Sequence, residues 1–152
     1  MIKEITQDFL NKVIEERKLL RKTLTMYNFR NCFIHNVDFG NLNSRFYFKN
    51  CLIKDCSFDQ SSTSLVFYNC TLDFVTFDDC ESLFIDAEST QFYDCSIETE
   101  EQKCRAFYAK GCTFINFYTD NEKIKKEVIE SNSIEELNKM LDENIFLKDI
   151  FL

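Results

Sequence analysis

The cysteines and the single histidine are the side chains of this 152-residue chain whose chemistry could serve a metal ion or a nucleophilic reaction. There are eight cysteines, and the closest two are Cys51 and Cys56, so the chain has no Cys-x-x-Cys pair. Zinc sites normally use ligand pairs at shorter spacing with further partners, and His35 is the only histidine. The N-terminal residues contain no apolar signal core, which disfavours a disulfide framework. We therefore expect neither a metal nor disulfides.

Motifs for catalysis are also missing from the sequence. There is no phosphate-binding loop, glycine-rich dinucleotide turn, nucleophile elbow or His-x-x-x-His pair. The adjacent carboxylates Asp78 and Asp79 are neighbours on one outward edge, which favours display over acid–base chemistry. Cys104 is the one cysteine with a cation on each side, so its thiol is the one to test for reactivity. We expect a protein that is not an enzyme and needs no cofactor.

Acidic residues without compensating cations fill the middle of the chain. The net charge is −8, and residues 55–101 hold 12 acidic residues but no lysine or arginine. A solvated surface normally mixes both signs, so this acidic band is the candidate partner-binding surface. Its members are Asp55, Asp59, Asp73, Asp78, Asp79, Glu81, Asp86, Glu88, Asp94, Glu98, Glu100 and Glu101.

The same region repeats a four-residue phrase, Phe-x-Asn/Asp-Cys. Copies begin at Phe29, Phe48, Phe67 and Phe92, and a degraded copy begins at Ala109. Successive copies start 19, 19, 25 and 17 residues apart, a spacing typical of one coil of a stacked solenoid. The cysteines that end the phrases are then expected to be small buried residues stacked coil upon coil.

A finer period of five residues runs through residues 27–117, which contain 14 of the 17 phenylalanines. In the first coil, for example, Phe29, Ile34 and Phe39 each follow a second apolar or small residue two positions earlier. This period is too long for strand alternation and does not fit a helix. It predicts a coil of four short sides, with breaks at 40–45, 60–64, 82–89 and 99–105 as corners or small loops. The 25-residue gap between Phe67 and Phe92 predicts an added five-residue unit.

The repeats are flanked by two segments of helical character within a single domain. Residues 1–25 are predicted to form an amphipathic helix that caps the first coil. Residues 26–119 are predicted to form the repeats, and residues 120–152 a C-terminal helical cap or dimerisation segment. A capping box at residues 133–136 supports the last of these. The apolar tail could cover the last coil or pack against a second copy. Its oligomerisation candidates are Ile145, Phe146, Leu147, Ile150, Phe151 and Leu152.

The five-residue units resemble those of pentapeptide-repeat proteins over residues 27–117. The resemblance is carried by Cys-x-Phe/Ile/Leu units, such as those beginning at Cys32, Cys51 and Cys70. It departs from the family pattern because Asn or Asp falls just before the Cys, as at Asn50. The resemblance implies a mainly β fold, a right-handed quadrilateral β-helix. A leucine-rich-repeat-like solenoid is the alternative, because residues 65–72 also read as L-x-L-x-x-C-x-L.

The charge density decides whether the acidic band is unusual. Its 47 residues would span about 2.4 coils, or roughly 11 Å of axis, so its 12 carboxylates exceed the linear charge of duplex DNA, about one per 1.7 Å. Spread evenly, each of four faces would carry about one charge per 4 Å, whereas two adjacent faces that held all of them would approach the DNA value. Several pentapeptide-repeat proteins act as DNA mimics, so the resemblance implies an inhibitor of gyrase, a restriction enzyme or another anti-phage defence enzyme. Such a partner has a basic nucleic-acid-binding surface.

The alternative function is a structural or adaptor solenoid that binds a protein through its terminal helices. We expect no direct binding of nucleic acid, because the acidic field would repel phosphates. No apolar stretch is long enough to cross a membrane, so we expect a cytoplasmic protein, in a bacterium or in a host cell if phage-encoded.

Overall fold

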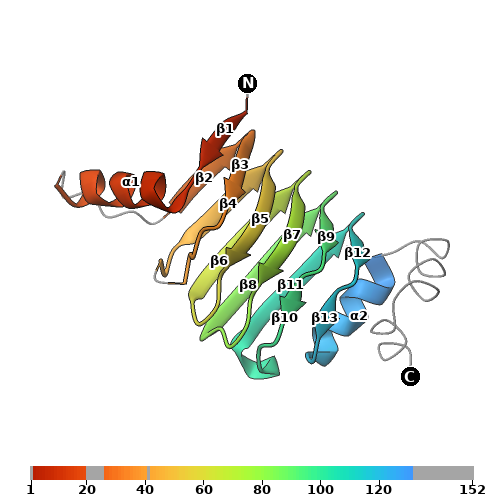
Figure 1. The fold of residues 1–152 in the computed structure, drawn as a ribbon. Helices are drawn as coiled ribbons and strands as arrows, with labels where there is room; N and C mark the ends of the chain where they lie inside the picture. Colours follow the sequence, from red (N-terminus) through yellow and green to blue (C-terminus); the bar gives the residue numbers. More distant parts are fainter. Residues whose placement is uncertain (1, 20–25, 41, 132–152) are drawn as a thin grey trace.

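The computed structural model describes residues 2–19, 26–40 and 42–131, and these form a parallel β-solenoid of about five turns (Figure 1). Two sheets run along the stack, and within each sheet the paired strands are parallel. Sheet B has five strands: β2 (Met26–Arg30), β4 (Arg45–Lys49), β6 (Ser62–Tyr68), β8 (Ser82–Glu88) and β11 (Cys104–Lys110). Sheet A has eight: β1 (Lys3–Ile5), β3 (Cys32–His35), β5 (Leu52–Ser57), β7 (Thr71–Thr76), β9 (Gln91–Tyr93), β10 (Ser96–Ile97), β12 (Thr113–Ile115) and β13 (Tyr118–Thr119).

The core consists of columns in which the same side-chain position recurs from coil to coil. Phe39, Phe58 and Phe77 stack with ring centroids 4.6 and 5.2 Å apart and are fully buried. A neighbouring column contains Ile53 and Leu72, which the strand register places directly over one another. Buried residues therefore recur every five positions, as the sequence predicts, because each side of the coil turns two side chains inward.

The corners explain why Asn or Asp precedes the cysteine in each phrase. Asn31, Asn50 and Asn69 adopt φ angles of 55°, 55° and 53°, the left-handed region that Asn tolerates better than most residues. Ser89 and Gly111 occupy the same corner in the last two coils, with φ angles of 51° and 62°. The Asn or Asp before the cysteine is thus explained by the left-handed backbone of the corners, which Asp55 and Asp94 share at the second corner.

All eight cysteines are buried and none forms a disulfide. Their thiols point at main-chain carbonyls, and several reach the coil below: Cys51 Sγ lies 3.4 Å from the Phe29 oxygen, and Cys70 Sγ lies 3.3 Å from the Phe48 oxygen. Cysteine suits this position because it is small and apolar, and because its weak S–H donor faces the buried carbonyl oxygen. The expected burial is confirmed for the cysteines that end all five phrases, and Cys32, Cys51 and Cys70 stack in one column.

The fourth phrase is out of phase with the others, which the sequence interpretation missed. Ala87, not Phe92, pairs with Phe67, and Phe92 pairs with Leu72 instead. Thr90 is the buried residue whose hydroxyl faces the Cys70 N–H, at 3.3 Å. The 25-residue gap therefore contains no added five-residue unit. The fourth phrase lies five residues later, on the next side of the coil, and small residues take the positions that the phrase occupies in the other coils.

Two expected breaks are strands. Residues 82–89 contain β8, whose inward residues Leu83, Ile85 and Ala87 alternate with outward ones. Residues 60–64 contain the start of β6, where Thr63 is buried and its hydroxyl donates to the Ser44 carbonyl. Polar and small residues made both segments look like loops. Pairing of sheet B across these coils holds them extended.

The N-terminal end is capped by a strand and a helix, not by one helix over residues 1–25. β1 pairs with β3, so the first residues extend sheet A before α1 (Gln7–Leu19) begins. Pairing with the open edge of β3 satisfies backbone groups of β3 that a helix would leave exposed. Ile5 and Leu10 are buried against the first coil.

The C-terminal end is capped by α2 (Glu122–Ser131), which lies against β11 and β13. A short 3₁₀ helix, η1 (Glu101–Lys103), precedes β11 in the chain. Ile124 and Val128 are buried, and Asn121 Oδ1 accepts the N–H groups of Lys123 and Ile124 as an N-cap. The capping box at 133–136 and the tail at 145–152 lie outside the described residues. No helix in the described ranges is long and apolar enough to span a membrane.

Candidate functional site: a carboxylate ladder at the third corner

Four carboxylates form a ladder along the third corner of the solenoid. Asp59, Asp78, Glu98 and Asp120 each follow the buried residue that ends the third side, one in each of four successive coils. Asp59 Oδ1 accepts the N–H of Asp78 at 2.8 Å, and Asp78 Oδ1 accepts the N–H of Glu98 at 2.9 Å. Because coils stack about 4.8 Å apart, this carboxylate ladder places one negative charge at about each 4.8 Å of axis.

Hydrogen bonds hold the carboxylates of Asp59 and Asp78 in place but do not remove the mutual repulsion of the rungs. The pKa of Asp78 is raised, first by partial burial and then by the neighbouring charges of Asp59 and Asp79, although bonds from the Glu98 N–H and the Ser96 hydroxyl oppose the shift. The pKa of Glu98 is raised by desolvation and by the charges of Asp78 and Asp120. The ladder is thus a site of concentrated negative potential.

Four further members of the acidic band lie next to the ladder, in the turns and short segments that lead to sheet B. They are Asp79, Glu81, Glu100 and Glu101. Lys103 partly offsets them, with its Nζ 3.9 Å from Glu81 and 4.0 Å from Glu100. Together with the ladder, they give eight carboxylates over four coils, about one per 2.4 Å of axis against about one per 1.7 Å for duplex DNA.

The structure places the other five members of the acidic band elsewhere. Asp55 and Asp94 occupy left-handed positions at the second corner, with φ angles of 53° for both. Asp73 lies on β7, and Asp86 and Glu88 lie on the outer side of β8. The acidic band is therefore brought together in part, with seven of its 12 members at or beside the third corner.

Sequence reasoning missed Asp120, the fourth rung of the carboxylate ladder, because Asp120 lies beyond the segment that lacks cations. The five-residue frame was the available signal, since Asp120 follows Thr119 as Glu98 follows Ile97. Gly40 holds the equivalent position in the first coil. A side chain there would put its Cβ 2.6 Å from the Asp59 backbone oxygen, so the ladder begins one coil later.

The thiols and His35 show no arrangement for catalysis. Cys104 is 2% exposed, and burial raises the pKa of its thiol although Lys123 and Arg105 act in the opposite direction. His35 Nε2 lies 2.5 Å from Glu4 Oε1, and its ring stacks on Phe33. Among the described residues, no group of three or more His, Cys, Asp or Glu side chains could hold a metal ion.

The oligomerisation candidates, residues 145–147 and 150–152, fall outside the described residues. The chain matches no protein-family model, no curated protein and no solved structure. The solenoid and its carboxylate ladder are therefore the findings on which a function can be argued.

Proposed function

We propose that the protein is a non-enzymatic inhibitor that occupies the nucleic-acid-binding surface of another protein with its carboxylate ladder. The observation that carries the proposal is the series Asp59, Asp78 and Glu98, in which the carboxylates of Asp59 and Asp78 each accept a backbone N–H from the next coil. A row of charges at regular spacing on a rigid scaffold resembles one phosphate strand of a duplex. The resemblance to pentapeptide-repeat proteins, several of which mimic DNA, supports this assignment.

The negative charge of the ladder would make it compete with nucleic acid for the partner's binding surface. Carboxylates of the ladder would pair with lysine and arginine side chains that otherwise contact phosphates. The concentrated negative potential steers the two proteins together, so the association rate and the affinity should both fall as salt rises. Rigidity would favour binding, because carboxylates held by hydrogen bonds lose little conformational entropy when a partner binds.

The test is inhibition of DNA supercoiling by purified gyrase and of cleavage by a panel of restriction endonucleases, at low and high salt. The ladder variant Asp59→Asn/Asp78→Asn/Glu98→Gln keeps the shape and the acceptor oxygens while removing three charges. The matched control Asp55→Asn/Asp86→Asn/Glu88→Gln removes three charges from other sides. We expect inhibition by the native protein, at least about ten-fold weaker inhibition by the ladder variant, and little change in the control.

Equal losses in the two variants would show that only net charge matters and would contradict a defined mimic surface. Inhibition that is unaffected by salt would contradict the electrostatic mechanism. A native protein that inhibits none of these enzymes and displaces no DNA from them would contradict the proposal itself.

A further inference from the structure

The outer edge of β2 is the open end of sheet B. Sheet B ends at β2, and in the described part of the chain no strand pairs with its outer edge, whereas β1 covers the corresponding edge of sheet A. The Asn31 N–H donates to the Lys49 carbonyl in the next coil. Because successive strand residues direct their hydrogen-bonding groups to opposite edges, the N–H groups of Asn28 and Arg30 face outward from the solenoid end.

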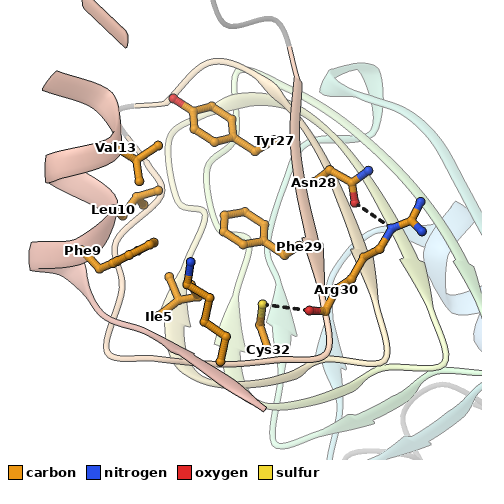
Figure 2. Close-up of a pocket in the computed structure, with 10 residues that line it drawn as sticks. Ile5, Phe9, Leu10, Val13, Tyr27, Asn28, Phe29, Arg30 and Cys32 are labelled. Carbon is orange, nitrogen blue, oxygen red and sulfur yellow. Dashed lines mark hydrogen bonds between the residues drawn. The ribbon is translucent and has the colours of Figure 1, made fainter. Parts of the chain in front are cut away.

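An apolar pocket of about 560 Å³ lies beside this edge (Figure 2). Its apolar walls come from β1 and α1 on one side and β2 on the other: Ile5, Phe9, Leu10, Val13, Tyr27 and Phe29. Asn28 and Arg30 also line it, yet their side chains are exposed and point away from it, so they contribute backbone. The pocket thus combines apolar walls with free strand-edge backbone.

The charges on the outer side of β2 and β4 are positive. Arg30 lies directly opposite Lys49 in the strand register, and like charges in such cross-strand pairs are unfavourable. Arg45 is a third cation on the outer side of these two strands, which carry no carboxylate. Lys3, within the pocket lining, places its Nζ 4.3 Å from the centre of the Phe9 ring. A residue placed beside Arg30 by an added strand would therefore be favoured if it were acidic.

We propose that the edge of β2 and the adjoining pocket bind an extended segment of a partner protein as an additional strand of sheet B. The segment alternates apolar residues, which enter the pocket over Tyr27 and Phe29, with acidic residues, which face outward beside Arg30. Main-chain hydrogen bonds supply affinity and the pocket supplies selectivity, as in other cases of strand addition. This site contains no residue of the carboxylate ladder and does not depend on the proposed inhibitory function.

The test uses the full-length protein and a synthetic, capped seven-residue peptide of alternating glutamate and valine in which phenylalanine replaces the central valine. Titration calorimetry or fluorescence anisotropy measures its binding. A second peptide has lysine in place of glutamate, and a third is methylated on its backbone nitrogens. Asn28→Pro removes one outward N–H without touching the β2–β4 bonds, and Asn28→Ala is its matched control.

We expect saturable binding of the glutamate peptide, binding at least about ten-fold weaker for the lysine and methylated peptides, and a similar loss in Asn28→Pro but not in Asn28→Ala. Circular dichroism checks that Asn28→Pro folds; if it does not, the methylated peptide alone decides whether the backbone edge is used. Absence of binding by the glutamate peptide overturns the proposal. Equal binding by the methylated or lysine peptide overturns it too, because the pocket would then act without the edge or without charge complementarity.

Discussion

The first and third corners of the solenoid carry ladders of nearly isosteric side chains with opposite consequences. At the first corner, Asn50 Nδ2 donates to Asn31 Oδ1 at 3.2 Å, and Asn69 Nδ2 donates to Asn50 Oδ1 at 2.8 Å. An amide both donates and accepts, so this asparagine ladder satisfies itself. An ionised carboxylate only accepts, so Asp59 and Asp78 take backbone N–H groups and leave their charges facing one another.

The two ladders therefore differ in role: one stabilises the fold and the other presents charge at the surface. The asparagine ladder occupies left-handed backbone positions and closes its hydrogen bonds internally, so it serves the fold. In the carboxylate ladder, desolvation and then repulsion between neighbouring carboxylates raise the pKa values of Asp78 and Glu98, so the ladder carries a cost that the fold does not need. Charge retained against its own repulsion is what a binding surface would require.

Breaking the asparagine ladder should produce the largest effect. Asn50→Val removes two side-chain hydrogen bonds and puts a β-branched residue at a φ of 55°, so we expect a loss of about 3 kcal/mol in the free energy of unfolding, measured by urea denaturation. Asn50→Gly is the control, because glycine accepts the backbone angle and should lose only about 1 kcal/mol. Similar losses in both variants would show that backbone angle has no part in the corner.

Extending the side-chain column of the carboxylate ladder into the first coil should also destabilise the fold. Gly40→Ala brings a Cβ to 2.6 Å from the Asp59 backbone oxygen, and we expect a loss of about 2 kcal/mol, measured by thermal denaturation. Gly111→Ala serves as a comparison, because its position has open space and only the backbone angle opposes a side chain. A larger effect at Gly111 than at Gly40 would contradict the close approach of these coils.

The second corner offers a stabilising change. Phe74 has a φ of 53° and is 57% exposed, whereas Asn36, Asp55 and Asn116 hold comparable left-handed positions. Asn tolerates this conformation better than Phe, so Phe74→Asn should raise the free energy of unfolding by about 1 kcal/mol. Phe74→Ala keeps the unfavourable angle and should not stabilise. A destabilised Phe74→Asn would mean that the aromatic ring makes contacts worth more than the strain.

Within the carboxylate ladder, neutralising one rung should have a small, pH-dependent effect. The pKa of Asp78 is raised above its ordinary value of 3.8, so the native state holds the proton more tightly than the unfolded chain does. The stability from this group is therefore full below the unfolded pKa and is lost as pH rises through the native pKa. Asp78→Asn should be about 0.5 kcal/mol more stable than the native protein at pH 7.

The advantage of Asp78→Asn should shrink as the pH falls toward 3.8, the ordinary pKa of an aspartate. Urea denaturation of both proteins at a series of pH values measures it. An advantage that grows on acidification would contradict the raised pKa.

The five-residue spacing of buried pairs was enough to predict the solenoid, because inward positions tolerate only apolar or small side chains and so reveal the period. The phase of the fourth coil was not predictable in this way. Ala87 and Thr90 fill the positions of Phe67 and Cys70, and neither residue type identifies a buried position by itself. β1 was missed because its three residues form a strand only against the open edge of β3.

The candidate site was predictable in content but not in arrangement. The absence of lysine and arginine between residues 55 and 101 marked the acidic band. Which members share a corner depends on how many residues each coil contains, and Glu98 and Asp120 enter the ladder after coils of different length. The close approach of Gly40 to Asp59 was not predictable for the same reason, because it is a contact between neighbouring coils.

In the proposed function the carboxylate ladder serves binding, whereas other features of the solenoid hold the fold. The most direct measurement compares Asp59→Asn/Asp78→Asn/Glu98→Gln with the native protein in two assays, urea unfolding at pH 7 and inhibition of gyrase supercoiling. We predict a free energy of unfolding that is unchanged or higher, together with inhibition at least about ten-fold weaker. A variant that loses stability but inhibits as well as the native protein would show that these carboxylates serve the fold and would contradict the account.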